Sequence, residues 1–558
     1  MKLKYLAYYS LILNCSNTVL GLEYLVSLKT DGTIQHFMDS TMSKGHSVKD
    51  FLGSKIGRTF SIGKFNGLTI ELSSRELLEN LKRNPFVADV IPNLQVKAFQ
   101  EDDYTLFNVT GNDFDVDIQS HKKLKRYREG YGSRRHYNYY DGDDDDHNNN
   151  YSDDDDDNDY EEEEEDYYDD YDDYERRHKN KKKKQHREKH YSDKKVVKKQ
   201  HGAPRHLARI SRRTQLPFDF QNNEKYKSLF HYYYDKWNQG SGVRVYILDS
   251  GIHSKHCEFE GRVEFGKDFT GEGRGDGNGH GTHVAGIVGS RTFGVAKGVQ
   301  LVDVKCLDSK GQGTLITVLS AIEFAVNDCS RHPDKKCVAN LSLGALKNTI
   351  INNAIKAAVD DGVVMVVAAG NFNMNACWSS PASAAEAITV GAFDDRIDTI
   401  AKFSNWGPCV DIFAPGVGIM SLSNKEHPEY VAYSGTSMAS PSVCGMAALL
   451  LDKGVEAKDV RMKLIKMATD DVFQKRTLIF KPKTPNRILF NGIDKFDDDY
   501  DEMTFPQLDL DVLVDELNEY STAPRIKEKY NKNYNLHLDN DVLLPFDEQR
   551  LFKRKADV

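Results

Sequence analysis

Hydrophobic residues between positions 203 and 492 follow two alternating patterns. Short runs of mainly apolar residues predict strands that are buried on both faces, at 243–248, 299–304, 338–343 and 363–368. The segments 314–327 and 349–361 lie between these runs and carry apolar residues at helical spacing. Strands that alternate with helices are typical of a parallel sheet covered by helices on both faces. The pattern therefore predicts an α/β fold for this region.

Residues 22–100 predict a smaller domain of strands and helices. Strands are expected at 24–28, 59–62 and 67–72, and again at 87–96. Ser73 and Glu76 have the spacing of a capping box, so a helix should begin there and end before Pro85. This order of elements is typical of a ferredoxin-like α+β module.

The first 21 residues have a composition of their own. Lys2 and Lys4 precede an apolar stretch at 6–13, and small residues follow. This is the pattern of a secretory signal peptide, and the stretch is too short to span a membrane. A retained amino-terminal helix is the alternative. No later run is apolar enough to cross a bilayer, so we expect a protein of the secretory pathway without a membrane span.

The formal net charge of −10 conceals strong segregation of charge along the chain. Asp, Glu, Tyr and Asn dominate residues 141–175, whereas Arg, Lys and His dominate 176–201. Because like-charged blocks of this length cannot bury a core, a disordered linker is predicted from 101 to 202. The basic half resembles a nucleic-acid patch, but the acidic block would compete for it, so we expect no nucleic-acid partner. The extension 493–558 indicates no mechanism.

Four polar residues stand where predicted strands end or helices begin. Asp249 ends the first apolar run, and Asn371 follows the fourth. His280 opens a helical segment, and Ser437 lies in a glycine-containing turn before the apolar helix 443–451. Each alone has an ordinary structural interpretation as a cap, a surface histidine or a turn residue. Since chemistry gathers at the carboxyl ends of parallel strands, together they supply the acid, base, nucleophile and oxyanion donor of acyl transfer.

Three motifs carry a resemblance to a known family. They are Asp-Ser-Gly at 249–251, Gly-His-Gly-Thr-His-Val-Ala-Gly at 279–286 and Gly-Thr-Ser-Met-Ala-Ser-Pro at 435–441. Residues 203–492 resemble a subtilisin-like serine protease of the proteinase K and cerevisin (fungal vacuolar proteinase B) branch. The domain at 22–100 resembles the inhibitory propeptide of these enzymes. The chain departs from the family where Ser442 and Ala345 replace the usual His and Gly.

The resemblance implies a role for each site residue. Ser437 attacks the peptide carbonyl, His280 exchanges the proton, and Asp249 orients the imidazole. Asn371 and the Ser437 N–H hold the oxyanion. Polypeptide substrate is expected to add as a strand between two segments, whose residues are Gly311, Gln312, Gly313, Ser342, Leu343 and Gly344. The chain's own propeptide is expected to occupy the same cleft as an intramolecular inhibitor, which makes the protein a zymogen.

Cysteines and one acidic residue complete the resemblance. It implies a disulfide between Cys377 and Cys409, and a structural calcium ion bound by Asp411 with the carbonyl oxygens of Ala385 and Ala387. An ordinary turn carboxylate is the alternative for Asp411. No cofactor is expected for the chemistry. Cys15 lies in the expected signal peptide. Of the other cysteines, Cys329 and Cys337 are close enough in sequence for a local pair. Cys257, Cys306 and Cys444 then remain, so at least one thiol should be free.

The segments expected to wall the specificity pocket, 340–348 and 365–383, contain no Asp or Glu. The absence of a buried carboxylate predicts a preference for apolar or aromatic residues before the scissile bond. The hypothesis is therefore a serine endopeptidase made as a zymogen and secreted to the cell exterior or delivered to the vacuole. A catalytically silent binding relative and a wall or matrix protein based on the charged tract are the alternatives.

Overall fold

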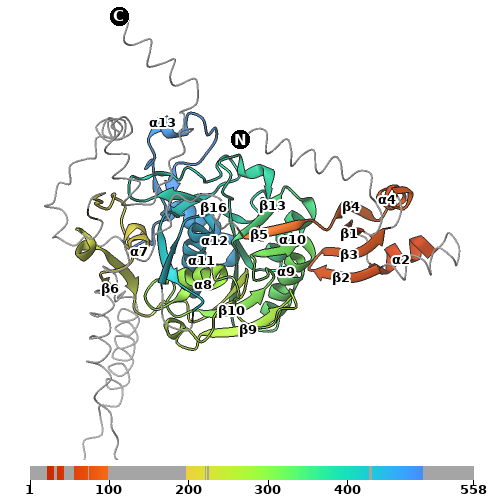
Figure 1. Cartoon of the computed structure of the whole chain (residues 1–558), viewed down its shortest axis with the longest axis horizontal. Coiled ribbons are helices and arrows are strands. Elements are labelled where there is room, and N and C mark those ends of the chain that lie inside the picture. The colour runs from red at the N-terminus through yellow and green to blue at the C-terminus, as the bar shows by residue number, and fades with distance from the viewer. Residues whose placement is uncertain are drawn as a thin grey trace, which may run out of the picture. The chain divides into compact units, whose positions relative to one another are not determined.

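The structure is a computed structural model of the 558-residue chain (Figure 1). It describes residues 22–29, 34–42, 56–72, 75–98, 197–219, 222, 225–425 and 430–493. The predictions for the signal peptide, for most of the linker and for the carboxyl-terminal extension lie outside the described residues. We call residues 22–98 the amino-terminal domain and residues 203–493 the large domain.

A ten-stranded sheet forms the centre of the large domain. Its strands run in the order β21-β22-β18-β16-β14-β12-β8-β10-β9, with β17 paired to β16. All neighbours from β9 to β22 are parallel, whereas β17 and β21 are antiparallel to their partners. The strands are β8 (Val243–Asp249), β9 (Val263–Asp268), β10 (Gln300–Lys305), β12 (Lys336–Leu341), β14 (Val364–Ala368), β16 (Ile388–Asp394), β17 (Thr399–Ile400), β18 (Ile412–Pro415), β21 (Thr469–Asp470) and β22 (Arg487–Ile488).

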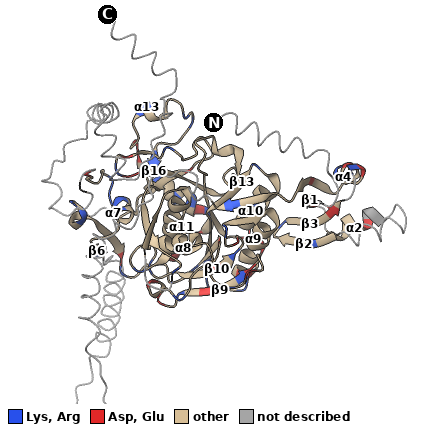
Figure 2. Cartoon of the chain, viewed as in Figure 1, with Lys and Arg blue, Asp and Glu red and all other residues tan. Residues whose placement is uncertain are grey.

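Helices cover both faces of this sheet, which confirms the predicted α/β fold. One hydrophobic core joins α8 (His280–Gly289), α11 (Thr436–Asp452) and α12 (Ala457–Met467) to one face. A second core joins α9 (Leu315–Ser330) and α10 (Thr349–Asp360) to the other. Along β8, Val245 and Ile247 belong to the first core, and Tyr246 and Leu248 to the second. Figure 2 shows α8 without charged residues, as its burial requires.

Strand β8 lies where the order of the sheet changes direction. The chain proceeds from β8 to β9 and β10 on one side, and then crosses to β12 on the other. Such a switch point leaves a crevice at the carboxyl ends of the flanking strands, which is where open α/β sheets bind ligands. Asp249 is the last residue of β8, so the topology alone places it at this crevice.

The amino-terminal domain has its own sheet and core. Its antiparallel sheet has the order β2-β3-β1-β4, which is the ferredoxin-like order expected from the sequence. The elements are β1 (Leu22–Leu28), α2 (Ile34–Met42), β2 (Ile56–Ile62), β3 (Phe65–Leu72), α4 (Arg75–Lys82) and β4 (Val87–Pro92). Helix α2 was not expected, although Ile34, Phe37 and Met38 have helical spacing and pack in this core.

Two expectations about strands are corrected. The single strand expected at 87–96 is divided: β4 ends at Pro92, and β5 (Gln95–Ala98) leaves the sheet. Proline has no N–H to continue a ladder, which favours a strand end at this point. The disordered linker was expected to reach residue 202, but β6 (Val197–His201) pairs antiparallel with β7 (His231–Asp235). The basic composition hid this strand because its ordering comes from β7 rather than from burial of its own side chains.

The remaining elements are short. They are α7 (Arg205–Ile210), β11 (Gln312–Thr314), β13 (Leu343–Leu346), β15 (Ser379–Ser380), the hairpin of β19 (Ile419–Leu422) and β20 (Tyr430–Tyr433), and α13 (Lys475–Leu478). Among the described helices, none combines the length and the apolar character needed to cross a bilayer.

Candidate active site

Asp249 and His280 meet at the carboxyl end of the central sheet. His280 is the first residue of α8, and Gly279 before it has a φ of 100°, a left-handed conformation that favours glycine. His280 Nδ1 lies 2.7 Å from Asp249 Oδ1, and both side chains are buried. The Ser250 N–H donates to the same oxygen at 2.7 Å. This bond fixes the carboxylate toward the imidazole.

The two histidines of α8 differ in their protonation. Burial alone would lower the pKa of His280, but the charge and hydrogen bond of Asp249, with the charge of Asp276, raise it above its ordinary value. Burial and the neighbouring His280 lower the pKa of His283 to about 3. The Nε2 atom of His283 lies 3.0 Å from the carbonyl oxygens of Ile419 and Val431. His283 is therefore a neutral structural donor, and His280 is the candidate base.

Ser437 lies in the first turn of α11, which packs directly against α8. Its hydroxyl donates to the carbonyl oxygen of Ser342 at 3.1 Å. The N–H groups in the first turn of a helix have no intrahelical acceptor and carry a partial positive charge. This turn therefore favours an oxyanion beside Ser437. His280 Nε2 is buried and has no hydrogen-bond partner among the described residues.

A proline four residues after Ser437 changes the bonding of the nucleophile turn. Pro441 lies inside α11 and has no N–H to donate to the Ser437 carbonyl. That carbonyl instead accepts from Ser342 Oγ at 3.0 Å. Asn340 continues the network, since its amide donates to Ser342 Oγ at 2.9 Å and its oxygen accepts from Ser440 Oγ at 2.7 Å. Because of the proline, the Ser437 carbonyl has no hydrogen bond within the helix from position 441. Its bond from Ser342 instead ties the nucleophile to the residue that follows β12.

Asn371 follows β14 and is held by the residue before the nucleophile. Its side-chain oxygen accepts from the Thr436 N–H at 2.9 Å and from Thr436 Oγ1 at 2.8 Å. Thr436 Oγ1 in turn accepts from the Gly370 N–H at 3.1 Å. Because its oxygen is engaged, the Asn371 amide presents its NH₂ group as a donor. The sequence identified Asn371 but not Thr436, which orients it.

Asp276 is a further site residue that the sequence analysis missed. Its carboxylate accepts from the N–H groups of Gly279 and Thr282, at 2.8 and 2.9 Å, and from the Ser250 hydroxyl at 2.9 Å. It therefore anchors the amino-terminal end of α8 that carries His280. An acidic residue just before a predicted helix interacts favourably with the helix dipole. The position of Asp276 before the helix that begins at His280 was therefore a signal that the sequence offered.

The predicted substrate cleft holds a segment of the chain itself. Strand β5 lies between β11 and β13, antiparallel to both, in a sheet that continues to β15. Lys97 pairs with Gln312 on one side and with Gly344 on the other. The Ala98 N–H donates to the Gly311 carbonyl at 2.9 Å. Five of the six residues predicted to bind substrate therefore border β5, namely Gly311, Gln312, Gly313, Leu343 and Gly344. The sixth, Ser342, contacts Ser437 instead.

The body of the amino-terminal domain packs on α9 and α10, and we call this the flank contact. Glu323 of α9 accepts from Arg58 Nη2 at 3.0 Å and from the Ser61 N–H at 2.7 Å. Thr349 at the start of α10 donates to Asp89. Apolar residues of the same strand β2 enter the core beneath α9 and α10, namely Phe60 and Ile62.

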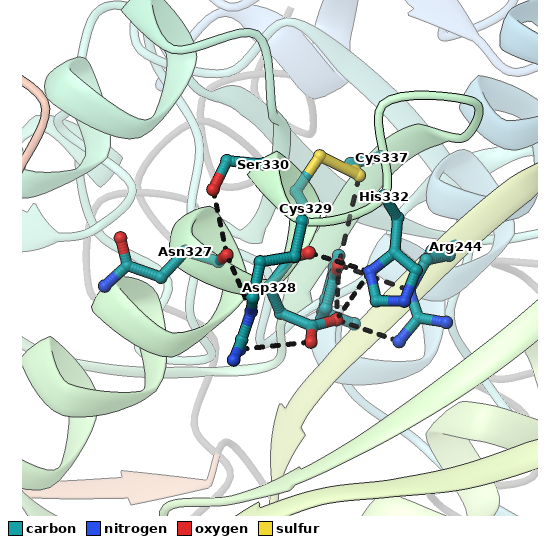
Figure 3. The surroundings of a disulfide bond; sticks show 9 residues. Arg244, Asn327, Asp328, Cys329, Ser330, His332 and Cys337 are labelled. Atoms are coloured by element: carbon teal, nitrogen blue, oxygen red, sulfur yellow. Dashed lines mark hydrogen bonds and ion pairs between the residues drawn. A yellow bond between two sulfur atoms is a disulfide. The ribbon is translucent and has the colours of Figure 1, made fainter.

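Two disulfides lie in the large domain. Cys377–Cys409 joins the segment after β14 to the loop that precedes β18. Cys329–Cys337 joins the end of α9 to the start of β12 (Figure 3). Asp328 beside it faces Arg244, whose guanidinium donates to the carboxylate at 2.8 Å (Figure 3). The three remaining described cysteines, Cys257, Cys306 and Cys444, are free thiols.

The expected calcium ligands at Asp411 face an arginine. Arg461 donates to Asp411 Oδ1 through Nε at 2.9 Å, and to the Ala385 carbonyl through Nη1 at 2.6 Å. A guanidinium in this position repels a second cation and occupies two of the three expected ligand groups, the Asp411 carboxylate and the Ala385 carbonyl. The residues present therefore do not fit calcium, and calcium binding stays a prediction that the experiment below tests.

Comparison with known proteins gives one match over nearly the whole chain and others over about half of it. A profile described as Subtilase family matches residues 240–488. The chain is 44% identical over 545 residues to the subtilase-type proteinase RRT12 of Saccharomyces cerevisiae, with 95% of each protein covered. It is 40% identical over 309 residues to the subtilisin-like serine protease Rho m 2.0101 of Rhodotorula mucilaginosa, covering 52% of this chain and 86% of that one. A solved structure of a cold adapted subtilisin-like serine proteinase is 36% identical, with a TM-score of 0.46, and covers 52% of this chain and 100% of that one.

Proposed function

The chain belongs to the subtilase family of serine endopeptidases, and we propose that it hydrolyses polypeptides through Ser437, His280 and Asp249 and is made as a self-inhibited zymogen. The observation that carries the chemistry is the 2.7 Å contact of His280 with Asp249 beside the helix that presents Ser437. The observation that carries the zymogen is strand β5 in the cleft. Motifs and the Cys377–Cys409 disulfide favour the proteinase K and cerevisin branch.

The reaction follows from these positions. His280 Nε2 takes the proton of the Ser437 hydroxyl as the oxygen attacks the peptide carbonyl. The oxyanion is held by the Asn371 amide and by the Ser437 N–H in the first turn of α11. His280 then gives the proton to the leaving amine, which yields an acyl-enzyme. Water then attacks the acyl-enzyme. His280 takes the proton from this water and returns it to the Ser437 oxygen, which releases the acid product. Asp249 holds the imidazole and stabilises its charged form throughout.

Strand β5 supports inhibition in cis. Its backbone uses the ladder bonds of β11 and β13 that an extended substrate needs, so substrate cannot bind while it stays. The register also suggests where the first cut falls. Leu343 pairs with Ala98, the last residue of β5, and the residue before Leu343 is Ser342. Because Ser342 bonds to Ser437, we expect self-cleavage to follow residue 99, which is Phe.

An aromatic residue at that position agrees with the proposed specificity. Neither 340–348 nor 365–383 offers a carboxylate, and Phe372 beside Asn371 is 49% exposed. Substrates with apolar or aromatic residues before the scissile bond are therefore favoured. Two disulfides support passage through an oxidising compartment, and we propose secretion or delivery to the vacuole.

A fluorophosphonate probe tests the chemistry directly. Wild-type and variant chains are first cut by added active enzyme and purified away from both that enzyme and the amino-terminal domain. They are then treated with the probe, and covalent labelling is measured. Labelling should be lost in Ser437→Ala and kept in Ser442→Ala, which removes another buried hydroxyl from the same helix. Labelling that persists in Ser437→Ala would refute the assignment of the nucleophile.

Mass spectrometry of the purified protein tests the zymogen separately. The wild type should yield fragments that end at residue 99, whereas Ser437→Ala should remain intact. Added active enzyme should then cut the Ser437→Ala chain at the same bond. Self-cleavage only at a distant bond would contradict the register of β5 while leaving the nucleophile in place.

A further inference from the structure

Asp411 lies at the start of β18, where it faces the segment that connects β14 to β16. This segment, residues 369–387, carries Asn371 and β15. The Asp411 side chain is 8% exposed, and its Oδ2 accepts from the Thr389 N–H at 2.8 Å. One carboxylate oxygen is therefore committed to the first residues of β16. The other oxygen is available to a cation.

Arg461 of α12 supplies that cation. Its Nε and Nη2 both donate to Asp411 Oδ1, and its Nη1 donates to the Ala385 carbonyl at 2.6 Å. A guanidinium is planar and permanently charged, so it bridges two fixed oxygens without the mobility of a lysine. The arginine thus joins a buried carboxylate to a main-chain carbonyl with three N–H groups.

A calcium ion would bridge the same two oxygens, but it needs six to eight oxygen ligands at about 2.3–2.6 Å. Here both oxygens already accept from one guanidinium. Within the described part of the chain, no three His, Cys, Asp or Glu side chains gather in a way that could hold a metal ion. The arrangement supplies the charge of a cation but not the coordination shell of calcium.

The arginine completes the anchoring of the connecting segment. The disulfide Cys377–Cys409 fixes its middle, and β15 pairs with β13 of the cleft. Arg461 fixes its end at Ala385. Helix α12 packs against the nucleophile helix α11 through Val460 and Leu464. The Arg461 guanidinium therefore links α12, which packs against the helix of Ser437, to the connecting segment that carries Asn371.

We propose that Arg461 is a resident cation at Asp411, which holds the connecting segment in place of a divalent ion. The wild-type site takes no calcium. Removal of the guanidinium leaves a buried carboxylate and a carbonyl oxygen facing an empty volume, and that volume takes calcium from solution. The proposal concerns folding and ion binding, so it stands or falls independently of the proposed reaction.

Melting temperature and bound calcium test the proposal in the full chain. All variants carry Ser437→Ala so that autolysis does not contribute. Chelator should leave the melting temperature of the parent unchanged. Arg461→Ala should melt about 5 °C lower in chelator, because a buried carboxylate loses its partner, and millimolar calcium should recover at least half of this loss. Equilibrium dialysis should find one more calcium ion per chain in Arg461→Ala than in the parent.

Two controls make the result specific. Arg396→Ala removes an arginine that binds Asp394 through two bonds without bridging to the Ala385 carbonyl, so calcium should not recover its stability. Arg461→Ala combined with Asp411→Asn should lose the recovery. A chelator-dependent loss in the parent that disappears in Asp411→Asn would overturn the proposal, because Asp411 would then hold calcium beside the arginine. Failure of calcium to recover Arg461→Ala would overturn it as well.

Discussion

The amino-terminal domain contacts the large domain in two places that use different chemistry. In the cleft, β5 pairs with β11 and β13 through main-chain groups, which any extended peptide carries. In the flank contact, Glu323 receives Arg58 and the Ser61 N–H, and few other chains offer that combination. In the zymogen proposed above, the cleft contact excludes substrate and the flank contact selects the inhibitor.

The first prediction removes both contacts at once. Deletion of residues 22–98 should yield protein without measurable activity. The domain contributes the strand β5, which pairs with both β11 and β13, and part of the core under α9 and α10. Activity is measured with a chromogenic peptide, and folding by circular dichroism. Adding the separate domain during refolding should recover both.

The matched control is deletion of residues 141–196, which spares β6. This chain should fold and remain inhibited, since loop closure depends only weakly on length. Full activity from the chain without residues 22–98 would contradict the first prediction and separate folding from inhibition.

The second prediction addresses the cleft alone. Asn371→Ala should lower kcat by about 10²–10³, the loss typical of removing one oxyanion donor in a bacterial subtilisin. Inhibition by the added domain should change far less, because the backbone pairs of β5 and the flank contact remain. A steady-state titration measures both quantities. An equal loss of turnover and of inhibition would show that the two contacts are not separable.

The third prediction addresses the flank alone. Glu323→Ala should weaken inhibition by the added domain about 10- to 100-fold, since a charged acceptor of two bonds is lost. Hydrolysis of a short peptide, which fills only the cleft, should change little. Glu264→Ala is the control, because it removes a carboxylate that pairs with Arg244 inside the large domain. Unchanged inhibition in Glu323→Ala would show that the cleft contact alone determines how strongly the added domain inhibits.

The smallest expected effect is a shift in pH dependence. The neutral form of His280 is the base, and the carboxylates of Asp249 and Asp276 raise its pKa above its ordinary value against the effect of burial. The rate kcat/KM should therefore fall as the pH drops through a midpoint above 6.5. Asp276→Asn removes a charge that favours imidazolium, so the midpoint should move to lower pH. A midpoint that moves upward would contradict this electrostatic assignment.

Sequence reasoning reached the residues whose positions are set locally. Asp249, Asn371 and His280 each stand at a strand end or helix start, and the parallel sheet brings such ends to one edge. The same holds for β1, β3 and α4 of the amino-terminal domain. The strands and helices that carry these residues were predictable because a period of two or 3.6 and a capping signal depend only on near neighbours.

Features that depend on distant partners were not reached. Arg461 and Asp411 are 50 positions apart, and no spacing rule joins them. Glu323 meets Arg58 across 265 positions. Strand β6 is basic and has no fully buried residue, so its pairing with β7 is what makes it a strand. The break between β4 and β5 has a local signal in Pro92, but its purpose, delivery of β5 to the cleft, is set by the large domain.

One chain holds both β5 in the cleft and β6 against β7, with 98 residues between Ala98 and Val197. A tethered strand competes at an effective concentration, which is on the order of millimolar for short flexible tethers and falls roughly as the −3/2 power of tether length. Cutting the tether alters no bond in the cleft, yet it returns the amino-terminal domain to its ambient concentration. Activation of the proposed zymogen then becomes a matter of dilution. The same cut would leave such an enzyme blocked in a small vesicle and release it in a large volume.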